Sequence, residues 1–116
     1  LTEAAARAAM GALHHIPVAR ETNLVGALET LKKSGVWVYG STPGEGVPLW
    51  AADLTGPLCL VVGSEGEGLR PLVARTCDVL VAIPMAGRIG SLNAGAAAAV
   101  LCYEVVRQRA GRAKTP

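Results

Sequence analysis

The feature that most constrains the fold is an unbroken apolar run at residues 58–62, Leu-Cys-Leu-Val-Val. A strand with one exposed face alternates apolar and polar residues, whereas a run of this kind indicates a strand covered on both faces. Residues 79–83 form a second such run, and residues 36–39 predict a further strand. Helical patterns separate these runs, so the sequence predicts an α/β fold with a parallel sheet and helices on both faces.

Helices are expected between and around these strands. Residues 2–13 are rich in Ala and good helix formers. A second helix follows Thr22 or Asn23, either of which can cap it, and Gly35 ends it. The remaining expected segments are a short helix at 69–76, a long Ala-rich helix from about 92 to 109, an extended segment at 16–19 and a Gly- and Pro-rich loop at 40–48.

Composition limits the class of protein. Of the 116 residues, 51% are hydrophobic and 17% are charged, which favours a packed domain over a disordered chain. The formal charge of +2 permits a nucleic-acid partner without requiring one. The three cysteines lack the spacing of metal ligands, so we expect reduced thiols, no metal site and a cytoplasmic protein. No apolar stretch reaches the roughly 18 residues of a membrane span, so no membrane partner is expected.

A glycine-rich turn, Gly-Ser-Glu-Gly-Glu-Gly at residues 63–68, follows the first apolar run directly. Turns between a strand and a helix are where open α/β sheets bind ligands. A P-loop would need Lys and then Ser or Thr where Leu69 and Arg70 stand. A dinucleotide fingerprint begun at Gly66 would need glycine in place of Pro71. The turn is therefore either a plain tight turn or a place where the backbone approaches another kind of ligand.

A second turn follows the other apolar run. Pro84 cannot donate to a sheet, which frees Ile83 and Met85 to face a ligand. Ser91 and Asn93 stand where a helix begins, and either can cap its exposed amides. Polar side chains, free amides and apolar neighbours together also describe a nucleoside pocket. Both turns are expected at the carboxyl ends of strands, so the sequence favours one ligand site between them.

The two turns resemble the second and third signature motifs of the SpoU (TrmH) family of RNA 2′-O-ribose methyltransferases, within the SPOUT superfamily. The matching residues are Gly63-x-Glu65-x-x-Gly68-Leu69 for the second motif, and Ile83-Pro84-Met85 followed by Ser91-Leu92-Asn93 for the third. The likeness continues at residues 11–18, 53–57 and 103–109, and so spans nearly the whole chain. The branch that methylates a guanosine of bacterial 23S ribosomal RNA is the most similar.

The resemblance implies an α/β fold with a C-terminal deep trefoil knot. It implies a methyltransferase domain over residues 1–110, and we expect residues 111–116 to form a disordered basic tail. It further implies S-adenosylmethionine as the cofactor, 23S ribosomal RNA as the substrate and a homodimer with the last helix at its interface.

The resemblance also assigns roles to residues of the two turns. The cofactor would be held by Gly63, Ile83 and Leu92, with Pro84 and Met85 along an apolar slot. The polar members of the active site would be Glu65, Ser91 and Asn93.

The family's first motif, an Asn and an Arg on an earlier helix, is not matched in the sequence, and neither Arg7 nor Arg20 occupies its context. That motif contributes the residue usually assigned to removing the proton from the ribose hydroxyl. The chain as given is therefore expected to bind the cofactor without catalysing. Two alternatives stay open. A transfer-RNA 2′-O-methyltransferase or an antibiotic-resistance relative would share both turns, and the chain could instead be a non-catalytic cofactor-binding or dimerisation module.

Overall fold

The computed structural model describes residues 23–63, 68–85 and 93–113, so the expected helix at 2–13 and the extended segment at 16–19 lie outside it. Four strands of the described residues form one sheet in the order β2-β4-β1-β3, and every pairing is parallel. The strands are β1 (Trp37–Ser41), β2 (Val47–Pro48), β3 (Leu58–Val62) and β4 (Val79–Ala82). The expected parallel α/β sheet is confirmed.

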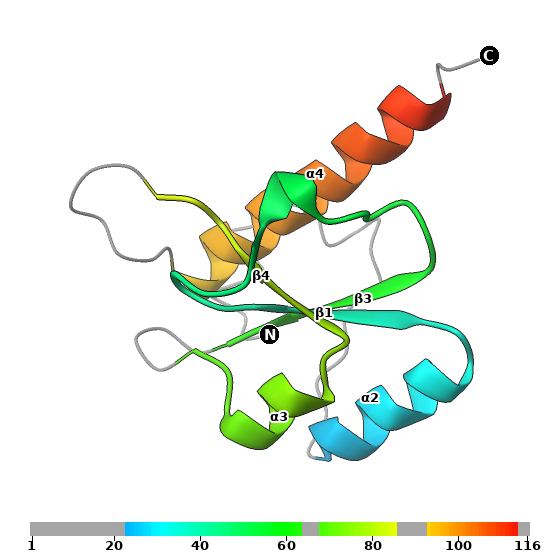
Figure 1. Cartoon of the computed structure of the whole chain (residues 1–116), viewed down its shortest axis with the longest axis vertical. Helices are drawn as coiled ribbons and strands as arrows, with labels where there is room; N and C mark the ends of the chain where they lie inside the picture. Colours follow the sequence, from blue (N-terminus) through cyan, green and yellow to red (C-terminus); the bar gives the residue numbers. More distant parts are fainter. Residues whose placement is uncertain (1–22, 64–67, 86–92, 114–116) are drawn as a thin grey trace.

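Helices cover both faces of this sheet, as the sequence predicted (Figure 1). One face carries α2 (Leu24–Lys33) and α3 (Pro71–Thr76), which contact each other. The other face carries the long helix α4 (Ala94–Ala113) and a single 3-10 turn, η2 (Leu49–Ala51). Within the described residues, no helix is long and apolar enough to cross a membrane.

The core accordingly has two layers. On the α2 side, Leu28 and Val73 pack against Val38 and Val61 of the sheet. On the α4 side, the buried cluster consists of Tyr39, Leu49, Ala52, Leu54, Val81 and Leu101. Alternate residues of each strand point to opposite faces, so one strand contributes to both layers.

The run at residues 58–62 became β3, with the predicted bounds. Leu58, Leu60 and Val62 pack against the cluster on the α4 side, whereas Cys59 and Val61 pack on the α2 side. Both faces are covered, as expected. Among the described strands β3 pairs with β1 alone, and this edge position explains why most of its residues are half-buried.

The loop expected at residues 40–48 is partly strand, which corrects the sequence prediction. β1 continues through Gly40 and Ser41, and Val47–Pro48 form β2. Gly40 fits because the space beside it is taken: a Cβ there would lie 2.6 Å from Cys77 Sγ and 2.7 Å from Leu69 Cδ1. Proline is tolerated in β2 because an edge strand needs no outward donor.

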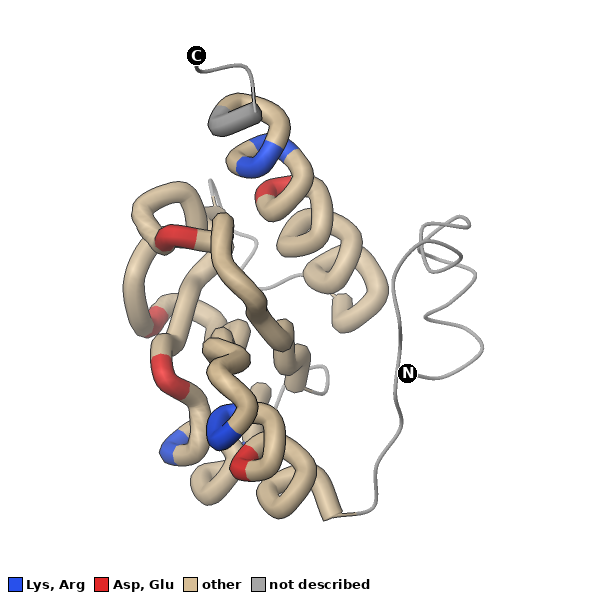
Figure 2. The backbone as a smooth tube through the Cα atoms, turned by 90° about the vertical axis from the view of Figure 1, so that its right-hand side faces the viewer, with Lys and Arg blue, Asp and Glu red and all other residues tan. Residues whose placement is uncertain are grey.

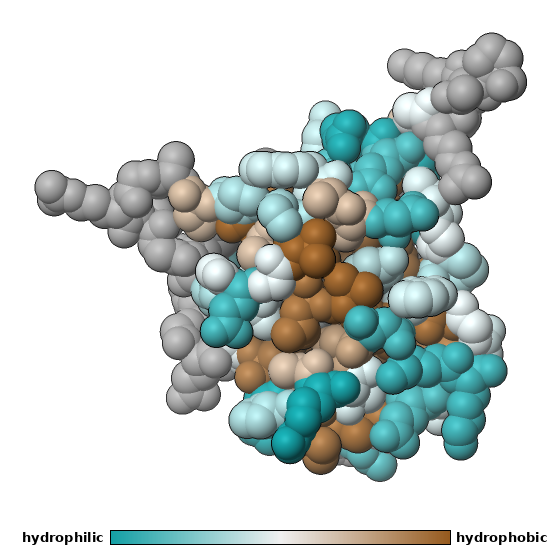
Figure 3. Space-filling model, viewed as in Figure 1, coloured by the Kyte–Doolittle hydropathy of each residue, from teal (hydrophilic) through white to brown (hydrophobic). Residues whose placement is uncertain are grey.

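β4 lies between β1 and β2, although it follows both in the sequence. The connection from β1 to β2 must therefore pass over the end of β4. Thr42 N–H donates to the Val81 carbonyl at 2.9 Å, and Gly46 lies against the backbone of Leu80. Because β2 pairs only with Val81 and Ala82, it covers just the end of β4. Hydrophobic side chains gather in the middle of the face where β4 runs (Figure 3).

The helix bounds differ from the expectation at two places. α3 begins at Pro71 rather than at residue 69, and proline suits the first position of a helix. α4 begins at Ala94 and runs to Ala113, so residues 111–113 continue the helix rather than starting a disordered tail. Residues 114–116 lie outside the described part of the chain.

Candidate functional site

The turns that follow β1, β3 and β4 lie at the same end of the sheet, where these parallel strands have their carboxyl ends. The three strands are parallel neighbours, with Ser41 of β1 opposite both Val62 of β3 and Val81 of β4. Gly63 and Ile83, which open the two motif turns, follow β3 and β4 directly. In open α/β sheets the ligand lies outside the carboxyl ends of the strands, which is where these turns stand.

Gly63 closes the first turn upon itself. A Cβ at residue 63 would overlap the backbone carbonyl of Gly68 and would lie 2.6 Å from the amide nitrogen of Leu69. The two ends of the turn therefore touch, and no larger residue fits between them. Gly68 has a φ of +70°, in the left-handed region that favours glycine. Leu69 then packs against Gly40 of β1, which fixes the turn to the sheet.

The second motif turn opens onto a groove beside β4. The groove has a volume of about 190 Å³ and is lined by Leu49, Trp50, Ile83, Pro84, Val100, Tyr103 and Glu104. Its walls are η2 on one side and α4 on the other. Ile83 is half-buried and also packs against the core, whereas Pro84 is exposed. Two of the predicted cofactor residues thus share one apolar groove.

Asn93 is the N-cap of α4. Its side-chain oxygen accepts from the Ala96 amide at 2.8 Å, and its backbone carbonyl accepts from Ala97 at 2.9 Å. The capping role that the sequence allowed for Asn93 is therefore seen. Its side-chain nitrogen is left to donate elsewhere, so capping and a role in the site are compatible.

The other site residues divide into two groups. Met85, three residues after the end of β4, is half-buried. Glu65, Ser91 and Leu92 lie outside the described residues, so their predicted roles stay predictions. The described residues contain no group of His, Cys, Asp or Glu arranged to hold a metal ion.

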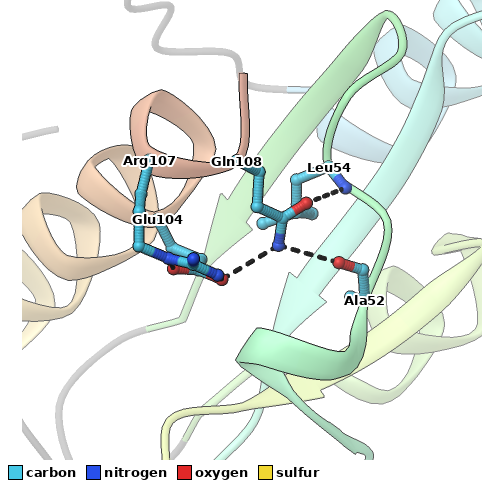
Figure 4. Close-up of polar contacts among 5 residues, drawn as sticks. All are labelled: Ala52, Leu54, Glu104, Arg107 and Gln108. Carbon is cyan, nitrogen blue, oxygen red and sulfur yellow. Dashed lines mark hydrogen bonds and ion pairs between the residues drawn. The ribbon is translucent and has the colours of Figure 1, made fainter. Parts of the chain in front are cut away.

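Sequence reasoning missed the other five groove residues, Leu49, Trp50, Val100, Tyr103 and Glu104. Trp50 and Tyr103 are 64% and 72% exposed, unusual values for large aromatic side chains. Glu104 is buried, and it accepts from Arg107 Nε at 2.6 Å and from Gln108 Nε2 at 2.9 Å (Figure 4). The Arg107 hydrogen bonds, helped by Gln108, lower the pKa of Glu104 to about 2. The sequence offered a signal for Tyr103 and Glu104, which belong to the family-like segment at residues 103–109, but not for Trp50, which lies outside the family-like segments.

The three cysteines are free, and burial raises the pKa of each thiol. A raised pKa keeps a thiol protonated and therefore weakly nucleophilic. This agrees with the expectation of reduced core thiols.

Lys and Arg residues of the described chain lie in two separate places, the last turns of α4 and the region of α2 and α3 (Figure 2).

A parallel α/β sheet whose glycine- and proline-marked turns follow the carboxyl ends of two of its strands defines a ligand-binding class of open α/β protein. Residues 1–103 match the SpoU rRNA Methylase family. The chain belongs to this family.

Two curated relatives show how far the likeness extends. The chain is 53% identical to an uncharacterized tRNA/rRNA methyltransferase of Synechocystis sp., over 94% of the chain and 28% of the relative. It is 47% identical to the 23S rRNA (guanosine-2′-O-)-methyltransferase RlmB of Ralstonia nicotianae, over 90% of the chain and 42% of the relative. The chain thus spans less than half the length of these relatives.

Solved structures share the fold. A TrmH/SpoU tRNA modifying enzyme of A. aeolicus is 34% identical with a TM-score of 0.71, covering 78% of this chain and 47% of that one. The SpoU methyltransferase AviRb of Streptomyces viridochromogenes, in complex with the cofactor AdoMet, is 34% identical with a TM-score of 0.65. That match covers 80% of this chain and 36% of AviRb.

Proposed function

We propose that the protein containing this chain transfers a methyl group from S-adenosylmethionine to a ribose 2′-hydroxyl of RNA. The observation that carries the proposal is the position of the two motif turns, which follow the carboxyl ends of β3 and β4 on either side of β1, in a chain of this family. The AdoMet complex of AviRb supports the cofactor, and the name of the Ralstonia relative supports a guanosine of 23S ribosomal RNA. Because RNA is the substrate, we place the protein in the cytoplasm.

The residues of the second turn suit this cofactor. Ile83 and Pro84 line an apolar groove, as a flat nucleoside requires. We assign cofactor contacts to Gly63, Ile83 and Leu92, with Pro84 and Met85 along the slot. When bound, S-adenosylmethionine supplies a methyl group activated by a positively charged sulfur.

The chain's own polar residues would orient the ribose hydroxyl rather than remove its proton. We assign this to Glu65, Ser91 and Asn93. The side-chain oxygen of Asn93 already accepts from the Ala96 amide. The contribution of Asn93 to orienting the ribose would therefore be its side-chain N–H donor, which this bond holds in a fixed direction. Alignment of the reacting atoms is itself a large part of such catalysis. The proton acceptor would come from the family's first motif, outside this chain.

We infer that the C-terminal part forms the deep trefoil knot. The support is the loop from β1 to β2, which crosses the end of β4 and leaves β4 between two strands that precede it. A later segment held between two earlier ones is an arrangement that threading produces, and it is rare in proteins. The methyltransferase domain would then include α4 to its end at Ala113.

We also propose a homodimer with α4 at its interface. Val100, Tyr103 and Val106 follow one another at three-residue intervals along α4, and all three are exposed. Trp50 of η2 is exposed beside them, and shares the groove with Val100 and Tyr103. A soluble helix seldom leaves such a stripe to water, and exposed apolar patches mark interaction surfaces.

Calorimetric titration of S-adenosylmethionine into the full-length protein tests the cofactor site. We expect binding to the wild type and none to Leu92→Asp, because a carboxylate in an apolar slot costs its hydration. Leu72→Asp is the matched control, since Leu72 is exposed on α3 at the opposite face of the sheet. A folded wild type without binding, or an unchanged affinity in Leu92→Asp, would contradict the assignment.

The RNA target is tested with labelled S-adenosylmethionine and the full-length protein. Transcripts of 23S ribosomal RNA and transfer RNA are offered separately, then digested to nucleosides. We expect label in 2′-O-methylguanosine from 23S ribosomal RNA. Label in transfer RNA alone would favour the tRNA alternative, for which the name of the A. aeolicus relative speaks. Cofactor binding without any transfer would favour the non-catalytic module.

A further inference from the structure

The segment between η2 and β3, residues 52–57, has neither helix nor strand, yet distant side chains hold its backbone. Gln108 and Arg109 of α4 reach it from more than 50 residues away in the sequence. Tyr39 of β1 donates its hydroxyl to the Asp53 carbonyl at 2.5 Å. Leu54, in the middle of the segment, is fully buried.

Gln108 uses both ends of its amide in this attachment (Figure 4). Its Nε2 donates to the Ala52 carbonyl at 2.9 Å and to Glu104 Oε2 at 2.9 Å. Its Oε1 accepts from the Leu54 amide at 2.8 Å. A rotated amide would set donor against donor, so the three bonds fix one orientation. Arg107 in turn holds the Glu104 carboxylate through two hydrogen bonds.

This attachment, which we call the Gln108 clasp (Arg107, Glu104, Gln108 and the backbone of residues 52–54), adjoins the groove. Glu104 belongs to both the clasp and the groove lining. The other wall, which Leu49 and Trp50 of η2 form, continues directly into Ala52, because η2 ends at Ala51. The clasp therefore ties the η2 wall of the groove to the α4 wall.

We propose that Gln108 is a positioning residue, which sets the separation of η2 and α4 and so keeps the groove shaped for its ligand. The inference rests on the proposed function in one respect, that Ile83 and Pro84 contact S-adenosylmethionine. A single 3-10 turn has little rigidity of its own, so its place depends on what holds its ends. Binding sites gain affinity when such supporting contacts hold their walls in advance.

The test compares Gln108→Met with the wild type in full-length protein that also carries Trp37→Phe, so that Trp50 is the remaining tryptophan of this chain. Methionine keeps the shape of glutamine and removes all three hydrogen bonds. We expect acrylamide to quench Trp50 more strongly, and the affinity for S-adenosylmethionine to fall about tenfold, the equivalent of one hydrogen bond. Ala110→Met, on an exposed site one residue beyond Arg109, is the control and should change neither readout.

Gln108→Glu is the second variant, and it separates positioning from general destabilisation. Near pH 8 its carboxylate would face that of Glu104 and could no longer donate. Once protonated at lower pH, it could again donate to Glu104 and accept from the Leu54 amide. Affinity should therefore recover on acidification in this variant more than in the wild type. The nearby charged groups are Glu104, Arg107, Arg109 and Asp53, and all are present in both proteins.

The two proposals fail in different ways. If the wild type binds no S-adenosylmethionine, the proposed function fails, while Trp50 quenching still tests the clasp. If the wild type binds and Gln108→Met matches it in affinity and quenching, the clasp has no positioning role. Unfolding of both Gln108 variants would overturn the proposal as well, because Gln108 would then support the whole fold rather than one wall of the groove.

Discussion

Two glycines in the loop over β4 share a left-handed backbone but differ in their surroundings. Gly44 has a φ of +70° with nothing within 4 Å of a built Cβ. Gly46 has a φ of +96°, and a Cβ there would overlap the carbonyl group of Leu80. Glycine at residue 44 is required by the backbone conformation alone. Glycine at residue 46 is required also because the connection from β1 to β2 passes closely over β4.

Gly46→Ala should therefore destabilise the protein more than Gly44→Ala. We expect Gly46→Ala to lower the free energy of unfolding by about 2–4 kcal/mol, from strain and overlap together. Gly44→Ala should cost about 1 kcal/mol, from strain alone. Urea unfolding of the two variants measures the difference. Equal losses would mean that the loop moves away from β4 without cost.

Glu104 gives the protein a sensitivity to acid. Its pKa in the folded protein is lowered to about 2, against 4.5 for an ordinary glutamate, so protonation weakens the fold. Its stabilisation is complete above about pH 4.5 and is lost as the pH falls toward 2. Thermal unfolding between pH 7 and pH 2 should show a steeper loss in the wild type than in Glu104→Gln. Glu29→Gln, on the exposed side of α2, should follow the wild type.

At the scale of elements, α4 begins after Asn93, which caps the helix and is also a proposed member of the active site. Asn93 caps the helix through its side-chain oxygen, as Asn23 does for α2 through a 3.1 Å bond to the Gly26 amide. Asn23 precedes a helix outside the motif turns, so it shows what capping alone is worth. The comparison of these two caps separates stability from activity.

Asn93→Asp keeps an oxygen for the cap and loses the side-chain N–H donors. We expect its stability to stay within about 0.5 kcal/mol of the wild type while methyl transfer by the full-length protein falls. Asn93→Ala and Asn23→Ala should each lose about 1 kcal/mol. Full activity in Asn93→Asp would show that the residue is a cap and nothing more. Urea unfolding and the methyl-transfer assay are the two measurements.

The elements with strong local signals were predictable from the sequence. The apolar run predicted the bounds of β3. Asn23 caps α2, and Gly35, with a φ of +87°, follows two residues after its last residue, as the sequence indicated. The position of both motif turns at the same end of the sheet followed from the parallel strands. Asn93 was foreseen as a cap because its residue type and place are typical of one.

The parts that depend on distant contacts were not predictable. Gly40 looked like a loop residue, and the reason it stands in a strand is the packing of Cys77 and Leu69 against it. β2 is two residues long, so no periodicity could mark it. The Gln108 clasp joins residues more than 50 positions apart, and no local sequence pattern predicts hydrogen bonds between such distant residues.

At the scale of the whole molecule, the two faces of the sheet differ in how their helices cover them. The α2 and α3 face is closed by two helices that contact each other. On the other face α4 buries Leu101 but turns Tyr103 and Val106 outward, at 72% and 59% exposure. The groove lies between α4 and η2 on that same face, and it shares Trp50, Val100 and Tyr103 with the surface proposed for the partner copy.

If α4 forms the homodimer interface, stability must depend on protein concentration, because association of folded protomers shifts the folding equilibrium toward the folded state. We expect the melting temperature of the full-length wild type to rise when its concentration is raised a hundredfold. Tyr103→Glu should abolish this rise and elute as a monomer in size-exclusion chromatography with light scattering, because it places a charge in the centre of the apolar stripe. Leu72→Glu, on an exposed site of α3, should remain dimeric. A dimer that survives both Tyr103→Glu and Val106→Glu would place the interface elsewhere, and the exposed stripe on α4 would then need another partner.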